Sequence, residues 1–280
     1  MPSQKKVALV IGSGSVKCAA ALGLKQALDR AGIPINMLVG CSGGSLYAAL
    51  MALNVPTEEI AAMSARLWTR ALTARANRRA LWQALFPKLA KFDSSFSLRD
   101  DKAINRQLQA VYGGKRFEDA SIPLYITATD FMTGELVTLS RGDLLPAIRA
   151  SLAIPLIFPA VQHEGRTLVD GYLSDPLPVS VAIREGADII IAIGFQADTQ
   201  SHLSSLMRYT FQFTSVVSNN LLKSNYAFTS LAHHSEVLLM VPEFEQRVRL
   251  FDTDKIPYVI QVGEREMGKQ LPYLQQLLSN

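Results

Sequence analysis

Two glycine-rich turns, each between an apolar run and a helical pattern, lie within the first fifty residues. The run at 7–11 leads into GSGSVKC at 12–18, and the run at 35–39 leads into GCSGG at 40–44. Consecutive parallel strands are joined by a right-handed crossover, so we expect both turns at the same carboxyl edge of one sheet. Open α/β sheets bind their ligands at this edge. The two turns therefore indicate an α/β fold and the position of its site.

The rest of the chain continues this alternation. Further strand-like apolar runs follow at 124–129, 189–193 and 237–241, separated by long helical patterns. Continuous apolar runs are typical of parallel strands in a sheet that is covered on both faces. A chain of 280 residues, 49% of them hydrophobic, can fill one large core. We expect a single domain over residues 1–280, with a mostly parallel central sheet and helices on both faces.

Two regions depart from the alternation. Residues 63–99 carry many basic side chains with interleaved aromatic ones, and we expect a basic helical insertion over the sheet. One interpretation is a lid that contacts anionic membrane, because such a surface suits the headgroup layer; a plain structural cover is the alternative. Residues 203–280 are expected to be a helical C-terminal segment, in which Leu206, Phe213 and Val216 recur near helical spacing.

Composition disfavours several classes of protein. No apolar stretch is long and uncharged enough to span a bilayer, and the run after Lys6 is too short for a secretory signal. The two cysteines, Cys18 and Cys41, give neither a disulfide framework nor a metal-ligand cluster, so we expect a cytoplasmic protein without metal or cofactor. We expect both to fill space as buried side chains, with a regulatory thiol pair as the alternative. The net charge of +4 is too small to argue for nucleic acid.

The second turn matches G-x-S-x-G around Ser42. In this motif the serine lies on a strained strand-to-helix turn that exposes its hydroxyl, and the helix N-terminus favours a developing negative charge. Ser42 is therefore the candidate nucleophile; a glycine- and serine-rich helix start that serves only as a cap is the alternative. Only one βαβ unit precedes Ser42, which disfavours the common Ser-His-Asp hydrolase fold.

The first turn also has to be considered as a nucleotide site. Against G-x-G-x-x-G it offers Gly12, Gly14 and then Lys17, and no acidic residue ends the following strand. A Walker loop fails as well, because Cys18 stands where serine or threonine is required. Nucleotide binding is therefore disfavoured.

Four stretches, taken in order, resemble the patatin-like phospholipase family. They are the Ser42 turn with its upstream loop, ITATDFMTGELVTLS, AIRASLAIPLIFPAV and LVDGYLSDPLPV. The resemblance extends from Val7 to about Phe195, and Asp170-Gly171 matches the family's D-G-G or D-G-A. It implies the family's three-layer architecture and an activity toward acyl esters of lipids.

The resemblance implies a catalytic Ser/Asp dyad. Asp170 would act as the general base toward Ser42, and water would hydrolyse the resulting acyl-enzyme. Burial would keep the pKa of the aspartate high enough for it to accept a proton. The implied oxyanion and binding residues, which would act mainly through main-chain N–H groups, are Ser13, Gly14, Ser15 and Gly43. Without its matching neighbours, Asp170 would be read as an ordinary turn aspartate before glycine.

The first turn departs from the family pattern. Where the family has G-G-G-x-R/K-G, this chain has SGSVKC, so Ser13, Ser15 and Cys18 replace glycines. Positive φ at these positions would strain a non-glycine backbone. We therefore predict modest turnover, and a catalytically weak member that binds acyl lipids or a protein partner is the alternative. Tyr172, in place of a small residue after Asp170-Gly171, is predicted to narrow the acyl pocket.

A histidine base is the remaining mechanistic alternative. Ser42, Asp170 and one of His202, His233 or His234 would follow the chain order of an α/β-hydrolase triad. The dyad needs no histidine, and lone histidines are more often surface residues. The sequence as a whole predicts a serine acyl hydrolase of the phospholipase A, lysophospholipase or carboxylesterase type, with an acyl lipid as substrate and no nucleic-acid partner.

Overall fold

The computed structural model describes residues 5–69, 76–77, 93, 96–199, 202–232 and 236–279. Its strands are β1 (Val7–Ile11), β2 (Met37–Cys41), β3 (Leu124–Asp130), β4 (Leu136–Leu139), β5 (Val161–His163), β6 (Arg166–Asp170), β7 (Ile189–Ile193) and β8 (Glu236–Met240). Its α-helices are α1 (Ala20–Arg30), α2 (Gly43–Ala52), α3 (Thr57–Leu67), α5 (Lys102–Tyr112), α6 (Leu144–Ser151), α7 (Val179–Arg184), α8 (Leu206–Ala232) and α9 (Ile256–Ser279). Short 3-10 turns include η1 (Ser15–Ala19) and η4 (Gly171–Leu173).

The strands form one eight-stranded sheet in the order β5-β6-β3-β2-β1-β7-β8, with β4 also paired to β3. From β3 through β2, β1 and β7 to β8 every pairing is parallel. The pairings that involve β4, β5 and β6 are antiparallel. The expected α/β fold with a mostly parallel sheet is therefore confirmed. The apolar runs correctly marked the five parallel strands. Strands β4 and β5 have only four and three residues, and β6 has only two apolar residues, Leu168 and Val169.

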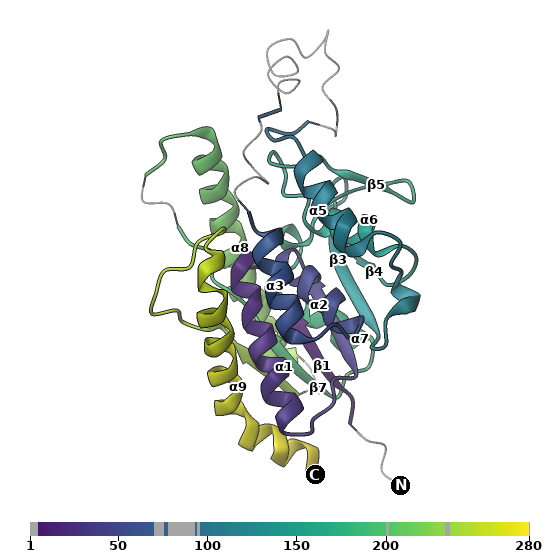
Figure 1. Cartoon of the computed structure of the whole chain (residues 1–280), viewed down its shortest axis with the longest axis vertical. Helices are drawn as coiled ribbons and strands as arrows, with labels where there is room; N and C mark the ends of the chain where they lie inside the picture. The colour runs from purple at the N-terminus through teal and green to yellow at the C-terminus, as the bar shows by residue number, and fades with distance from the viewer. Residues whose placement is uncertain are drawn as a thin grey trace.

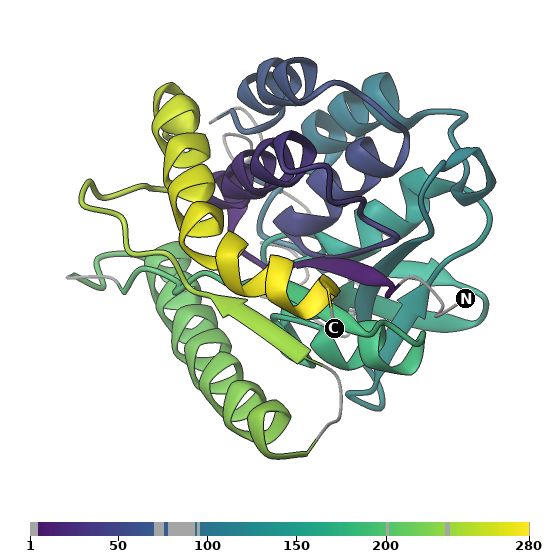
Figure 2. The same cartoon turned by 90° about the horizontal axis from the view of Figure 1, so that it is seen from below.

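Alternate residues of the central strands enter two separate cores. Leu9 and Ile11 of β1 belong to the larger core, which includes apolar side chains of α1, α2 and α9. Ala8 and Val10 belong to a smaller core that is closed by α7 and by Leu222 of α8. Figure 2 shows the resulting layers, with α1 and α9 on one side of the sheet and α8 on the other. Burial on both faces explains why these strands are continuously apolar.

The C-terminal segment contains a strand as well as helices, because β8 lies between α8 and α9. Helix α9 runs alongside α1 (Figure 1), and glycines allow their backbones to touch. A Cβ atom at Gly23 of α1 would collide with the Ile260 carbonyl, and one at Gly263 of α9 would collide with the Ala20 carbonyl. This close contact fixes the end of the chain to its first helix.

Most of the predicted basic insertion at 63–99 lies outside the described residues, including Arg75, Arg78, Arg79 and Trp82. Its first residues belong to α3, which begins before the predicted boundary, at Thr57. Trp68 is buried rather than turned toward solvent. No helix in the described part of the chain is long and apolar enough to cross a membrane.

Candidate active site

The two glycine-rich turns lie next to each other at the carboxyl edge of the sheet. The last residue of β1, Ile11, pairs with Gly40 of β2. Helix α2 starts immediately after Ser42 and passes close to both strands: a Cβ atom at Gly40 would lie 2.6 Å from the Cα of Ser45, and one at Gly44 would collide with the Ile11 carbonyl. The glycines of G-x-S-x-G are therefore needed for the chain to turn from strand to helix in so little space.

Ser42 occupies the strained conformation that the motif predicts. Its φ is +51° and its ψ is −125°, a region that non-glycine residues enter at a cost of about 1–3 kcal/mol. Its N–H donates to the Ser151 hydroxyl at 2.8 Å, and its own hydroxyl donates to Oδ2 of Asp170 at 2.7 Å. Ser151 was not singled out in the sequence, because only the fold brings residue 151 to the turn at residue 42.

Asp170 ends β6 and is fully buried. Its N–H donates to the Ala153 carbonyl, its own carbonyl accepts from Thr129 Oγ1, and its Oδ1 accepts from the Tyr172 N–H at 3.1 Å. A Cβ atom at Gly171 would lie 2.7 Å from the Thr127 carbonyl oxygen, which explains the glycine after the aspartate. Main-chain contacts on both sides therefore hold the carboxylate against Ser42.

Burial raises the pKa of Asp170 from 3.8 to about 7, although the hydrogen bonds from the Ser42 hydroxyl and the Tyr172 N–H oppose this shift. Desolvation penalises the charged form of a buried carboxyl. A group with a pKa near the working pH is both partly ionised and basic enough to take a proton. The Ser42–Asp170 pair can therefore exchange a proton near neutral pH.

Main-chain donors that could hold an oxyanion come from both turns. Among the described residues, no acceptor is found for the N–H groups of Gly14, Ser15 and Gly43. Gly43 lies against the first turn, since a Cβ atom there would be 2.8 Å from the Ser15 nitrogen. The Ser13 N–H, by contrast, donates to the Pro176 carbonyl at 2.8 Å. Ser13 lines the cavity, but its main-chain donor is already engaged.

Only one of the three serine and cysteine replacements in the first turn carries backbone strain. Ser15 has φ +53°, whereas Ser13 and Cys18 are not among the residues with positive φ. The condition for strain, a positive φ, is therefore met at Ser15 and is not met at Ser13 or Cys18. Gly14 has an extended φ of 177°, and it is required for packing, because a Cβ atom there would lie 2.8 Å from Cγ of Phe195.

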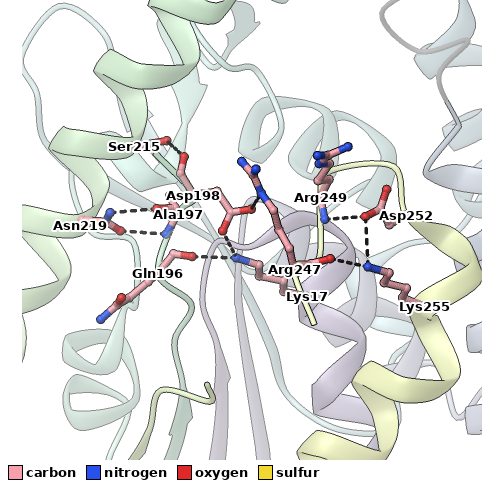
Figure 3. A network of polar contacts seen from close by, with 10 residues as sticks. All are labelled: Lys17, Gln196, Ala197, Asp198, Ser215, Asn219, Arg247, Arg249, Asp252 and Lys255. Carbon is pink, nitrogen blue, oxygen red and sulfur yellow. Dashed lines mark hydrogen bonds and ion pairs between the residues drawn. The ribbon is translucent and has the colours of Figure 1, made fainter. Parts of the chain in front are cut away.

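Lys17 fastens the first turn to the loop that follows β7. Its ammonium lies 2.8 Å from Asp198 Oδ1 and donates to the Gln196 carbonyl at 3.0 Å (Figure 3). It also lies over the ring of Phe244. Asp198 also approaches Arg247 at 3.9 Å. The basic residue of the turn thus has a positioning role, and its charge is matched by a carboxylate.

A cavity of about 540 Å³ opens beside Ser42, within the size range of sites for small organic ligands. Much of its wall is apolar, with contributions from Leu46, Leu67, Trp68, Ile104, Leu108, Leu152, Ile157, Phe158 and Phe251. Tyr172 also lines the cavity, and its buried hydroxyl has no hydrogen-bond partner among the described residues. The arrangement suits a long apolar chain that ends at the Ser42 hydroxyl.

The two cysteines belong to the turns of the site but are not suited to act as nucleophiles. Both cysteines are free and buried, and burial raises the pKa of each thiol, so neither is a reactive thiolate. Of the three candidate histidine bases, His202 does not line the cavity, and His233 and His234 lie outside the described residues. In the described part of the chain no cluster of acidic, histidine and cysteine side chains could hold a metal ion.

Known proteins that are similar to this chain belong to the patatin-like and NTE families. The family model described as "Patatin-like phospholipase" matches residues 9–183. An uncharacterized NTE family protein of Mycobacterium tuberculosis is 32% identical over 191 residues, which are 68% of this chain and 49% of the relative. The human patatin-like phospholipase domain-containing protein 6 is 29% identical over 205 residues, 71% of this chain and 14% of the relative. The lysophospholipase NTE1 of Scheffersomyces stipitis is 28% identical over 191 residues, which are 68% of this chain and 12% of the relative.

The chain thus spans half or less of the length of these curated relatives. Among solved structures, VipD from Legionella pneumophila matches with a TM-score of 0.52 at 12% sequence identity, over 97% of this chain and 67% of that one. At this identity the match supports the shared three-layer α/β fold. The family match includes Ser42 and Asp170, whereas α8, β8 and α9 lie beyond it.

Proposed function

Because the chain belongs to the patatin-like phospholipase family, we propose that it is a serine acyl hydrolase that cleaves lipid esters of the phospholipase A, lysophospholipase or carboxylesterase type. The family description and a relative named as a lysophospholipase support lipid hydrolysis at the level of the family. The observation that carries the proposal for this chain is the 2.7 Å hydrogen bond from the Ser42 hydroxyl to the buried Asp170 carboxylate.

In the proposed mechanism Asp170 accepts the proton of the Ser42 hydroxyl while Oγ attacks the ester carbonyl. The negative charge that develops on the carbonyl oxygen is stabilised by the N–H groups of Gly14, Ser15 and Gly43. The proton then passes from Asp170 to the departing alcohol, and an acyl-enzyme remains on Ser42. Water then attacks the acyl carbonyl while Asp170 takes its proton, and this proton passes to Ser42 Oγ as the fatty acid leaves.

The test is hydrolysis of p-nitrophenyl butyrate in solution by the wild type and by Ser42→Ala. We expect the variant to lose nearly all turnover and to keep its circular dichroism spectrum and melting temperature. Ser64→Ala is the matched control, because it removes a buried serine hydroxyl on α3 outside the cavity wall. A Ser42→Ala enzyme that still hydrolyses the ester at the wild-type rate would refute the proposal.

A catalytically weak lipid-binding member is the second candidate, and the strain at Ser15 is the observation that favours it. A misdirected oxyanion donor costs about two orders of magnitude in turnover. The wild type could bind a fluorescent fatty-acid analogue in competition with a lysophospholipid, yet hydrolyse neither the lysophospholipid nor p-nitrophenyl butyrate. In that case this second function replaces the first.

Two expectations from the sequence remain predictions. Contact of the 63–99 segment with anionic membrane can be tested by vesicle co-sedimentation of a variant with Arg75, Arg78 and Arg79 changed to glutamate. Binding that is reduced in this variant and weakened by salt would support the contact. A cytoplasmic location is consistent with two buried, free cysteines, and cell fractionation would test it.

A further inference from the structure

Helix α8 turns apolar side chains toward solvent in its first three turns. Leu206 is 62% exposed, Tyr209 60%, Phe213 60% and Val216 45%, and Leu203 just before the helix is 54% exposed. We call these five residues the α8 stripe. The four helical members follow one another at intervals of three and four residues, so they share one face of the helix. Contiguous exposed apolar surface of this kind usually marks an interaction site.

The opposite face of the same helical turns lines the cavity beside Ser42. Arg208, Phe211, Ser215 and Ser218 follow the same spacing and all belong to the cavity wall. Each lies two residues, or about 200°, from a member of the α8 stripe. Surface helices of globular proteins normally direct their apolar side inward. Here the outward face is the more apolar, and α8 is the wall between the cavity and that outer surface.

Unmatched positive charge lies at the same end of the molecule. The charged residues of the cavity wall are Lys17, Asp198, Arg208, Arg247 and Arg249. Asp198 contacts both Lys17 and Arg247 (Figure 3). The guanidinium groups of Arg208 and Arg249 have no acidic partner among the described residues, and in Figure 3 the head group of Arg249 points to the same side as that of Arg247. An anionic surface would complement this charge.

We propose that the protein docks to an anionic phospholipid bilayer through the α8 stripe, together with Arg208 and Arg249 of the adjoining cavity wall. The inference rests on the proposed function: the proposed substrate is a lipid ester, and the acyl chains of such a lipid lie inside a bilayer, so the enzyme has to reach the membrane surface. Large apolar side chains enter the interface between headgroups and acyl chains, and arginines bind the phosphates around them. Docking through the outer face of α8 would leave only the width of this helix, about 10–12 Å, between the membrane and the cavity.

The experiment is co-sedimentation with vesicles of phosphatidylcholine alone and of phosphatidylcholine with phosphatidylglycerol, at low and high salt. The stripe variant is Leu206→Ser with Phe213→Ser. Its matched control is Phe131→Ser with Met132→Ser, which removes one exposed aromatic and one exposed aliphatic side chain from the turn between β3 and β4. The charge variant is Arg208→Gln with Arg249→Gln, matched by Arg106→Gln with Arg166→Gln at exposed arginines outside the cavity wall.

We expect the wild type and both controls to bind the anionic vesicles, the stripe variant to bind at least tenfold more weakly, and the charge variant to lose most of the salt dependence. Equal binding by the stripe variant and the wild type would overturn the proposal, as would a wild type that binds neither vesicle. A dimer in sedimentation equilibrium that the stripe variant dissolves, without any vesicle binding, would instead assign this face to a second copy of the chain.

Solution hydrolysis of p-nitrophenyl butyrate separates this proposal from the proposed function. The stripe variant should hydrolyse this soluble ester at the wild-type rate, because its two side chains are outside the cavity. If the wild type binds anionic vesicles through the α8 stripe but hydrolyses no ester, the docking surface stands and the proposed function fails. If the wild type hydrolyses the ester but its vesicle binding does not depend on the α8 stripe, the docking surface is refuted and the proposed function stands.

Discussion

The two glycine-rich turns at the carboxyl edge of the sheet are built alike but differ in what their strain provides. Each holds one serine at nearly the same positive φ, +53° at Ser15 and +51° at Ser42. At Ser42 the strained backbone aims a hydroxyl at Asp170. At Ser15 the side chain has no hydrogen-bond partner among the described residues, and the useful group is the main-chain N–H. The comparison suggests that strain at Ser42 serves chemistry, whereas a glycine would serve better at Ser15.

The largest expected effect concerns the partner of Ser42. Asp170→Asn should lower turnover of p-nitrophenyl butyrate by about three orders of magnitude or more, because it removes the base of a two-residue unit. In the wild type, activity should rise with pH through about 7, where Asp170 loses its proton. A pH–rate profile checks this. Combining Asp170→Asn with Ser42→Ala should add little to either loss, and fully additive losses would contradict the dyad.

The same substitution should raise stability at high pH. The pKa of Asp170 is about 7 in the folded protein and about 3.9 in the unfolded chain, so between these values the folded state binds more protons and its stability falls as pH rises. The neutral amide of the Asp170→Asn variant avoids this cost. Urea unfolding at pH 8 should show the variant more stable by up to about 4 kcal/mol, with the gain disappearing toward pH 4. If the variant is less stable than the wild type at pH 8, burying the charged Asp170 carboxylate does not carry the expected cost in free energy of unfolding.

The next effect concerns the glycines of the second turn. Gly44→Ala places a methyl group against the Ile11 carbonyl and within 2.7 Å of the Gly12 carbonyl, both of which are backbone atoms that cannot move aside cheaply. We expect a loss of about 1–3 kcal/mol in the free energy of unfolding, the usual cost of overpacking. Gly268→Ala on α9, where an added Cβ meets open space, is the control and should be neutral or stabilising. Equal effects would contradict the packing account.

The smallest expected effect is at Ser15. Ser15→Gly should raise the free energy of unfolding by a few tenths to about 1 kcal/mol, because glycine adopts positive φ without strain. We expect turnover to rise by a few-fold if the relaxed turn directs its N–H groups better at the oxyanion. Cys18→Gly should not help, because Cys18 is fully buried without positive φ and its removal leaves a void. Thermal melts and initial rates of both variants test this ranking.

The chemistry at each turn could be predicted from local sequence, but the contacts between distant residues could not. G-x-S-x-G predicts a strained serine because its constraint is confined to five residues. The Ser42–Asp170 contact joins residues 128 apart, and only the family resemblance connected them. Ser151, whose hydroxyl accepts the Ser42 N–H, lies in one of the stretches that carry the resemblance, but nothing in the sequence connects it to Ser42. Strands β4 and β5 were missed because they are short and mostly not buried, and β6 was missed because it has only two apolar residues among five.

Helix α8 shows a different limit of the sequence. The recurrence of Leu206, Phe213 and Val216 indicates a helix, and the structure has one there. Periodicity alone does not say whether the apolar face packs inward, and in α8 it faces solvent. Charge and tryptophan content, which are visible in the sequence, predict a lipid-facing surface in the 63–99 segment, and this stays a prediction. Of the two tryptophans there, Trp68 is buried in the cavity wall and Trp82 lies outside the described residues.

The most direct test of the central claim is labelling by a fluorophosphonate, followed by peptide mapping. Such a probe reacts with a serine hydroxyl only when a base and an oxyanion site activate it. We predict that the wild type is labelled at Ser42, that labelling disappears in Ser42→Ala and falls sharply in Asp170→Asn, and that the rate of labelling rises with pH through about 7. Three results would contradict the assignment of Ser42 and Asp170 as the catalytic pair: no labelling of the wild type, labelling at a different serine, or labelling of the Asp170→Asn variant as fast as that of the wild type.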